Sequence, residues 1–319
     1  FNGVSWQVWV SDGTSDGTFP RSEEGLYMGN TPVNVGGALI FVGTEDYPDG
    51  TNAEPYYMTD DALYLIKDSK PGAVPSTSSG FMVLGEGGAI FAANDGVNGN
   101  EPWITNGTLD GTFLLEDIVP GVGGSDPWFL GVLNGSVLFA ANDGVEGIGL
   151  YTVGLAMPAT PVRIHDVDVL VANGQRGVVL GTALHFVAGG ELWRTDGTIA
   201  GTYQVADSWP GPSGVLGQYD PAPVEAGGVL YYRAWGPVGG KELWRSDGTE
   251  AGTFLMQDRA PGINHFDPSY LTVLGDHLYM RGESMPGKLR EFQRALFADM
   301  DAATLDQMAI FQYLIGNTD

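Results

Sequence analysis

Short runs of alternating apolar and polar residues, separated by glycine-rich turns, recur along most of the chain. The clearest pair runs from Phe81 to Leu84, turns through Gly87-Gly88 and returns from Ala89 to Ala92. A period of two on both sides of such a turn predicts a β-hairpin. After a polar loop, a second pair follows at residues 101–105 and 112–116. One unit is therefore expected to form four antiparallel strands.

A turn motif marks the second hairpin of each unit. An aromatic residue is followed after two residues by Asp or Asn, Gly and Thr, and after two more by Gly and Thr, in copies that begin at Trp9, Trp103, Trp193 and Trp244. Two degenerate copies of the motif keep the aromatic position, which we assign to Tyr57 and Tyr151. These six anchors are 42 to 51 residues apart. Because that period is the size of a propeller blade, the motif is interpreted as a structural turn.

The ends of the chain are predicted to complete each other. The hairpin at residues 6–23 has no first hairpin before it, and the hairpin at 270–281 has no second hairpin after it. Joining them closes a ring without free sheet edges. The predicted fold is thus all-β, a six-bladed β-propeller of four-stranded blades over residues 1–284. Seven blades are the alternative, in which Phe292 or Phe297 is the anchor of a degenerate seventh copy.

Residues 285–319 are predicted to form a short α-helical C-terminal extension. Glycine is absent from 288 to 315. Large apolar residues recur there at helical spacing, namely Leu289, Phe292, Leu296, Phe297 and Met300. Such a tail could pack on the propeller rim, or it could dock a protein partner or a larger assembly.

Composition narrows the classes of partner. The chain has 319 residues and a net charge of −25, which repels nucleic acid and anionic lipid. It contains no Cys, so disulfides, thiolate metal sites and Cys nucleophiles are excluded. No apolar run is long enough to span a bilayer. The first residue is Phe1, as expected of a mature chain or a fragment.

The loops between the second and third strands of the units are candidate calcium sites. Their oxygen-bearing side chains are Asp46, Asp49, Asn52, Glu54, Asn94, Asp95, Asn98, Glu101, Asn142, Asp143 and Glu146. Calcium binds six to eight such oxygens, although none of these loops has the EF-hand pattern. Hydrated turns are the alternative interpretation.

Three tryptophans outside the motif, Trp128, Trp209 and Trp235, are candidate contacts for a glycan or a protein partner. Packing between blades is their alternative role. The four His residues are scattered, so a zinc pair is not expected, and His185 and His277 are interpreted as structural. No nucleophile or nucleotide motif is found, but paired carboxylates in the propeller mouth could hydrolyse a glycoside.

Residues 191–202 and 242–253 read Glu-Leu-Trp, two residues, Asp-Gly-Thr, two residues, Gly-Thr. They resemble the repeat of bacterial secreted or surface proteins that are sometimes described as hyalin-like, and the resemblance covers about residues 1–281. It implies a secreted or cell-surface location and transfers no catalytic residue.

The function expected from these features is that of an extracellular, non-catalytic binding or assembly module. Such a module would act in cell-surface adhesion, or as a subunit that docks through its C-terminal tail. A carbohydrate-active enzyme or a calcium-dependent lectin that uses the propeller mouth is the alternative.

Overall fold

The computed structural model describes residues 6–29, 31–45, 53–68, 80–85, 87–156, 159–166, 176–208, 216, 222–236, 240–256, 266–275 and 277–282. These residues form 25 β-strands and contain no helix, so the all-β prediction is confirmed for the described part of the chain. The predicted helical extension and its boundary at residue 285 lie outside the described residues.

Five sheets of four or five strands follow one another along the chain, and we number them as blades. Blade 1 contains β3 (Tyr27–Met28), β4 (Val33–Val35), β5 (Ala38–Thr44), β6 (Ala53–Met58) and β7 (Leu63–Leu65). Blade 2 contains β8 (Met82–Val83), β9 (Ala89–Asn94), β10 (Asn100–Thr105) and β11 (Phe113–Leu114). Blade 3 contains β12 (Trp128–Leu133), β13 (Ser136–Asn142), β14 (Ile148–Gly154) and β15 (Val162–His165).

Two further blades and two hairpins complete the described strands. Blade 4 contains β16 (Val178–Leu180), β17 (Ala183–Ala188), β18 (Glu191–Thr195) and β19 (Tyr203–Gln204). Blade 5 contains β20 (Val224–Ala226), β21 (Val229–Trp235), β22 (Lys241–Ser246) and β23 (Phe254–Leu255). The N-terminal half-blade is β1 (Trp9–Ser11) with β2 (Thr18–Pro20), and the C-terminal half-blade is β24 (Ser269–Leu274) with β25 (His277–Arg281).

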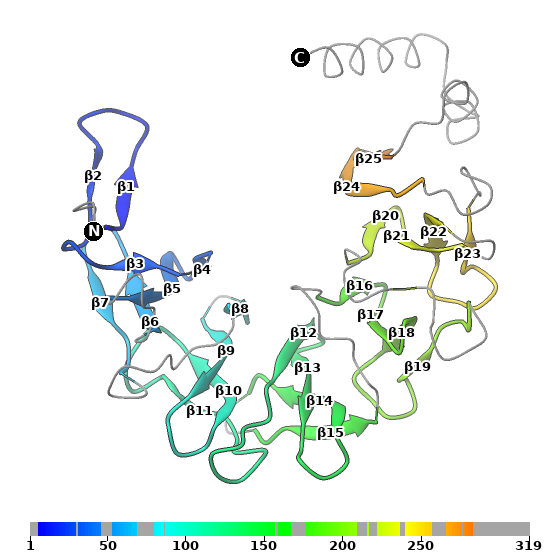
Figure 1. Ribbon diagram of the computed structural model, residues 1–319, viewed down its shortest axis with the longest axis horizontal. Helices are drawn as coiled ribbons and strands as arrows, with labels where there is room; N and C mark the ends of the chain where they lie inside the picture. The colour runs from blue at the N-terminus through cyan, green and yellow to red at the C-terminus, as the bar shows by residue number, and fades with distance from the viewer. Residues whose placement is uncertain are drawn as a thin grey trace.

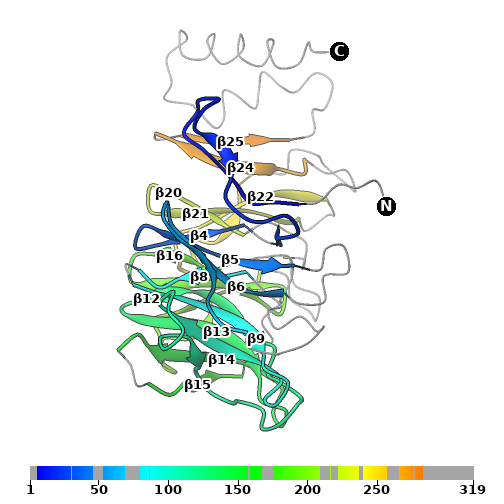
Figure 2. The ribbon, with the colours of Figure 1, turned by 90° about the vertical axis from the view of Figure 1, so that its left-hand side faces the viewer.

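The sheets are arranged as the blades of a β-propeller. In blades 2 to 5, neighbouring strands pair antiparallel in chain order. Figure 1 shows the blades following one another around an arc, with the two half-blades at its ends. In the side view the sheets are stacked along the arc (Figure 2). The half-blades form two separate two-stranded sheets, so the predicted closure is not formed between the described strands.

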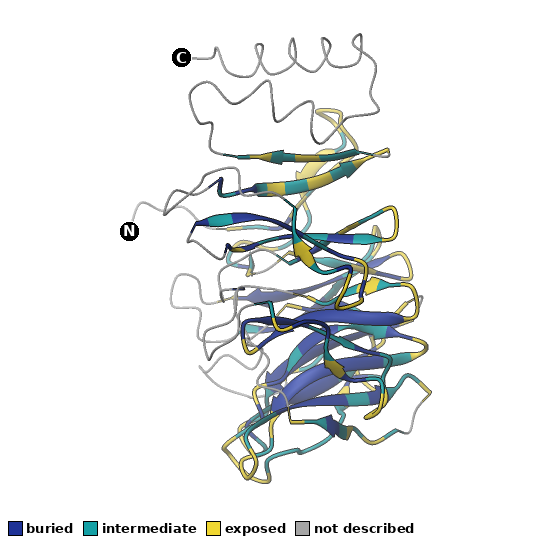
Figure 3. Cartoon of the chain, turned by 90° about the vertical axis from the view of Figure 1, so that its right-hand side faces the viewer, coloured by how far each residue is buried: buried dark blue, intermediate teal, exposed yellow. Residues whose placement is uncertain are grey.

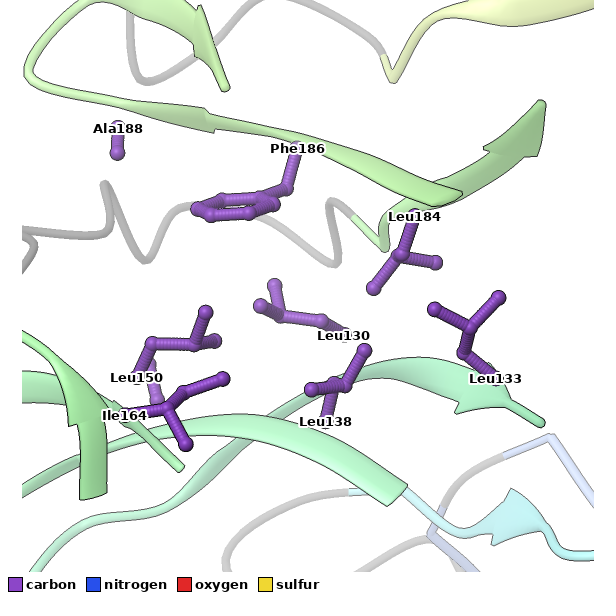
Figure 4. Close-up of a cluster of buried hydrophobic side chains, with 9 residues drawn as sticks. Leu130, Leu133, Leu138, Leu150, Ile164, Leu184, Phe186 and Ala188 are labelled. Carbon is purple, nitrogen blue, oxygen red and sulfur yellow. The ribbon is translucent and has the colours of Figure 1, made fainter. Parts of the chain in front are cut away.

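The hydrophobic core lies between the blades. Side chains alternate between the two faces of each sheet, and each face packs against a neighbouring blade. Between blades 3 and 4, Leu138 and Leu150 face Phe186, and all three are essentially inaccessible to water (Figure 4). Figure 3 shows that burial is concentrated in the middle blades and falls toward the half-blades.

The repeated turn has the structural role that the sequence predicted. In blade 5, Asp247 Oδ1 accepts hydrogen bonds from the backbone N–H of Thr249 at 3.0 Å and from its hydroxyl at 2.6 Å. Asn106 in blade 2 makes the same two bonds to Thr108. A side chain at Gly252 would collide with the Asp247 carboxylate, which explains the Gly of the closing Gly-Thr pair.

The anchor of blade 1 is Tyr56, and the prediction of Tyr57 was wrong. Tyr56 pairs with Phe41, as Trp103 pairs with Phe91 in blade 2. Tyr57 points to the opposite face, where its ring stacks on Tyr64 at a centroid distance of 4.9 Å. The turn after Tyr56 is shortened, so an alignment on the Thr-Asp pair shifts the register by one residue and reverses the face.

Candidate functional site

Five of the described candidate calcium ligands, Asn94, Asp95, Asn98, Asn142 and Asp143, form side-chain hydrogen bonds within their own turns. Asp95 Oδ1 accepts the backbone N–H groups of Val97 and Asn98, at 2.8 Å and 2.7 Å. Asp143 Oδ1 accepts those of Val145 and Glu146, at 2.9 Å and 2.7 Å. These bonds lower the pKa of Asp143, and for Asp95 they outweigh the opposing effect of burial.

Further amide contacts complete these turns. Asn94 and Asn142 each accept the N–H of a turn glycine at 2.8 Å, and Asn98 donates to Asp95. Asp46, Asp49 and Asn52 lie outside the described residues. Within the part of the chain that the structure describes, no three His, Asp or Glu side chains are grouped so that they could hold a metal ion. Calcium remains a prediction from the sequence.

Glu54 and Glu101 lie at the start of the third strand of their blades rather than in the loop, and both are buried. Glu101 Oε1 accepts the N–H of Val119 at 3.0 Å, and Oε2 accepts the Ser125 hydroxyl. Burial raises the pKa of the Glu101 carboxyl, and these hydrogen bonds act against that shift. The carboxylate therefore fastens the loop that leads to the next blade.

Two further glutamates occupy the same position, although the sequence did not lead us to predict a role for them. Glu191 accepts the N–H of Ser208 at 3.2 Å, and Glu242 accepts that of Phe266 at 3.3 Å. Both are buried. The signal was present in the sequence, since a Glu stands two residues before the anchor of blades 1, 2, 4 and 5. We call these four residues the clamp glutamates.

Blade 3 replaces the clamp glutamate with an arginine from its outer strand. Gly149 stands at the clamp position, and a Cβ there would lie 2.5 Å from Cζ of Arg163. Arg163 forms ion pairs with Asp143 and Asp166, each at 2.9 Å. The guanidinium also donates to Gly147 O at 3.0 Å. Blade 3 thus fills the clamp position with a positive charge.

The predicted aromatic contacts have different environments. Trp128 is half-buried and packs against the cluster between blades 3 and 4, in agreement with the packing alternative. Trp235 is 40% exposed, and its ring lies 5.7 Å from Nζ of Lys241. Trp209 and the tail residues Leu289, Phe292, Leu296, Phe297 and Met300 lie outside the described residues.

His185 is a buried residue at the interface of blades 4 and 5. It is 1% exposed, and Nε2 would lie 3.0 Å from a Cβ at Gly248 of blade 5. Burial lowers the pKa of His185 to about 4, and the nearby charge of Arg194 acts in the same direction. The ring is therefore neutral near pH 7. His165 packs edge-on against Trp193 at 5.3 Å.

No protein-family model matches the sequence, and no curated protein matches it. A puromycin-hydrolyzing peptidase of Mycobacterium tuberculosis is 13% identical with a TM-score of 0.48, over 82% of this chain and 43% of the peptidase. A puromycin hydrolase is 15% identical with a TM-score of 0.46, over 76% and 41%. The putative TolB of Agrobacterium tumefaciens is 12% identical with a TM-score of 0.39, over 80% and 90%. The chain spans less than half the length of these two peptidases.

These neighbours correct the function expected from the sequence. An extracellular, non-catalytic adhesion or assembly module was predicted, with a glycan enzyme or lectin as the alternative. The solved structures that share the architecture include puromycin hydrolases and prolyl endopeptidases, which contradicts that prediction. The error arose because a repeat defines a scaffold, and one scaffold serves several functions. The described residues contain no helix that is long and apolar enough to cross a membrane.

Proposed function

We propose that the chain closes into a six-bladed ring and serves as the propeller domain that accompanies a peptidase catalytic domain. The observation that carries the proposal is the use of the buried carboxylates. Glu101, Glu191 and Glu242 each fasten the loop that leads to the next blade, so they stiffen a frame. In this proposal the frame positions chemistry that another domain supplies. The prolyl endopeptidases and puromycin hydrolases among the structural neighbours agree with it.

Ring closure is supported by what the half-blades leave uncovered. Trp9 is 58% exposed, whereas its equivalents Trp103 and Trp244 are 4% and 6% exposed. Leu274 is 68% exposed, whereas Leu133 at the same position of blade 3 is 6% exposed. Among the described strands, β25 has no third-strand partner, and β1 is a third strand without a second-strand partner. Each half-blade offers the strand that the other lacks.

The complete blades fix the register of this pairing. Their anchors pair with a large aromatic residue of the second strand, as Trp193 pairs with Phe186 in blade 4. Counted from the turn after the first strand, Met280 occupies the position of Phe186. Closure therefore pairs Met280 with Trp9 and Tyr279 with Val10.

Engineered cysteines test the closure in a chain that has none of its own. The variant Tyr279→Cys with Val10→Cys is expected to form an intramolecular disulfide on mild oxidation, measured by non-reducing mass spectrometry. The matched control, Tyr279→Cys with Ser11→Cys, places the two thiols on opposite faces and should stay reduced. Equal oxidation of both variants, or disulfides only between copies, would contradict intramolecular closure.

The peptidase association is tested by activity. The isolated chain and the native protein that contains it are incubated with a proline-containing peptide library, and products are identified by mass spectrometry. Cleavage by the native protein alone is expected. Cleavage by the isolated chain would place catalysis within it, and cleavage by neither would remove the peptidase association.

A further inference from the structure

Blades 4 and 5 each carry an arginine beside an exposed aromatic ring at the outer edge of the sheet. Arg194 on β18 pairs with Tyr203 on β19, and Arg245 on β22 pairs with Phe254 on β23. The guanidinium carbons lie 5.1 Å and 5.2 Å from the two ring centroids. Tyr203 and Phe254 are 44% and 45% exposed. We call these two pairs the arginine–aromatic rows.

Neither guanidinium of the rows has a hydrogen-bond or ion-pair partner among the described residues. Nε of Arg194 and Nε of Arg245 are both buried without a hydrogen bond. Arg163 of blade 3 is different, since it pairs with Asp143 and Asp166. The turn carboxylates Asp196 and Asp247 attract Arg194 and Arg245 electrostatically, but neither carboxylate forms a hydrogen bond or an ion pair with the arginine. A planar guanidinium held against a ring is well suited to bind a carboxylate through two hydrogen bonds.

The rows lie next to open sheet edges. β19 and β23 are the last strands of their sheets, and no described strand pairs with their outer sides. Figure 1 shows both strands on the outside of the arc, in neighbouring blades. An extended polypeptide can add to such an edge through backbone hydrogen bonds. An added strand would place every second side chain on the face that carries the arginine.

We propose that the outer edges of blades 4 and 5 bind an acidic polypeptide segment. The segment adds as a strand beside β19 or β23, and its carboxylates bind Arg194 or Arg245 above the aromatic ring. The open backbone edge selects a polypeptide, and a guanidinium that lacks a hydrogen-bond or ion-pair partner among the described residues selects an acidic one. This assignment goes beyond the proposed function, because it gives a ligand to the outer rim and needs neither hydrolysis nor a second domain.

The repeat supplies an internal control. In blade 2 the same row holds Ile104 opposite Phe113, so the ring and the edge are present without the cation. Phe113 is exposed to a similar degree as Tyr203. Ile104→Arg should therefore create a third row of the same kind.

The experiment uses a fluorescent ten-residue peptide of alternating Glu and Thr, with Gln replacing Glu in its matched control. Binding to the whole chain is measured by fluorescence anisotropy at low and high salt. Arg194→Gln with Arg245→Gln is expected to weaken binding of the Glu peptide by about tenfold or more. Ile104→Arg should strengthen it, and high salt should weaken it. Circular dichroism verifies that each variant is folded.

Three results would overturn the proposal. Equal binding of the Glu and Gln peptides would remove the carboxylate contact. Unchanged affinity of the double arginine variant would move the site elsewhere. Undiminished binding of the Glu peptide after N-methylation of alternate residues, which blocks strand pairing, would show that the edge is not used. None of these readouts depends on peptidase activity, so the proposed function stands or fails separately.

Discussion

The interface between blades 3 and 4 and the two ends of the arc are built from the same repeat, but they differ in burial. Phe186 and Leu138 are fully buried at the interface, whereas none of the four half-blade strands contains a buried residue. The anchor side chain is covered mainly by the neighbouring blade. Exposure of an anchor residue in this repeat therefore indicates a missing neighbour before it indicates a ligand site.

The largest expected effect comes from truncating an anchor at an interior interface. Trp103→Ala should lower the free energy of unfolding by about 3 to 5 kcal/mol, because it removes a buried ring and leaves a cavity. Trp9→Ala is its matched partner at the end of the arc. If the half-blades stay apart, that substitution should cost less than about 1 kcal/mol. Denaturant unfolding of both variants measures the difference.

If both substitutions lowered the free energy of unfolding by similar amounts, the interior and the end of the arc would not differ in how the anchor is buried. They would show that Trp9 is covered in solution, as ring closure requires. A small loss from Trp103→Ala would contradict the assignment of the core to the spaces between blades.

The clamp glutamates give the next largest effect. Glu101→Ala should lower the free energy of unfolding by about 2 to 4 kcal/mol, because the Val119 N–H and the Ser125 hydroxyl lose their buried acceptor. Gln7 has the same place before Trp9 in the N-terminal half-blade, where its amide donates to Ser22 O at 3.2 Å. Gln7→Ala is the control, with an expected cost of about 0.5 kcal/mol. Equal costs would mean that the carboxylate does not fasten the loop.

His185 makes one interior interface sensitive to acid. Because its pKa falls from 6.5 to about 4 on folding, the unfolded chain binds a proton first as the pH decreases. The stability due to the neutral ring is complete above about pH 6.5 and is lost between pH 6.5 and 4. The loss amounts to roughly 3 kcal/mol.

The variant His185→Leu tests this, since Leu138 and Ile90 occupy the same position in blades 3 and 2. Chemical denaturation at pH 7, 5.5 and 4.5 should show a shallower pH dependence in the variant than in the parent chain. Parallel curves would exclude His185 as the acid-sensitive group.

The smallest effect is expected in the turns, which do not distinguish interior from end. Asp247→Asn should change the free energy of unfolding by less than about 0.5 kcal/mol, because Asn106 makes the same two hydrogen bonds in blade 2. Hydrogen bonds from the Thr249 hydroxyl and N–H lower the pKa of Asp247. The charged carboxylate therefore stabilises the folded parent chain slightly above the pKa of a free Asp. The amide variant should lack this contribution. A loss above 1 kcal/mol would indicate a further role for the charge.

The sequence was sufficient for the four-stranded units of the described part and their order, because turn chemistry and period are local. The Asp-Gly-Thr turn needs a short acceptor and a glycine at set positions, so four clear copies located the second hairpins. Blade 1 shows where this prediction reaches its limit. Its turn is shortened, so only strand pairing could distinguish Tyr56 from Tyr57 as the anchor. A shift of one residue there changes which neighbour a side chain meets.

The candidate site was less predictable, because a side chain's role depends on which group it meets across a loop. Glu101 follows a polar loop and reads as a calcium ligand, but its partners Val119 and Ser125 lie in a different loop. Asp95 and Asp143 belong to polar loops of the same type, and both cap their own turns. The sequence shows which side chains carry acceptor oxygens, whereas the fold determines which donor groups reach them.

The exchange of Glu for Arg163 in blade 3 bears on how such a repeat can evolve. Restoring Glu at position 149 would collide with the guanidinium, and removing Arg163 alone would leave Asp143 and Asp166 without their cation. The effect of a change at one site then depends on the residue at the other, which is epistasis within a single repeat. A recombination that swaps half of blade 3 with another unit would combine incompatible halves. An exchange of blade 3 as a whole unit would keep Gly149 and Arg163 together.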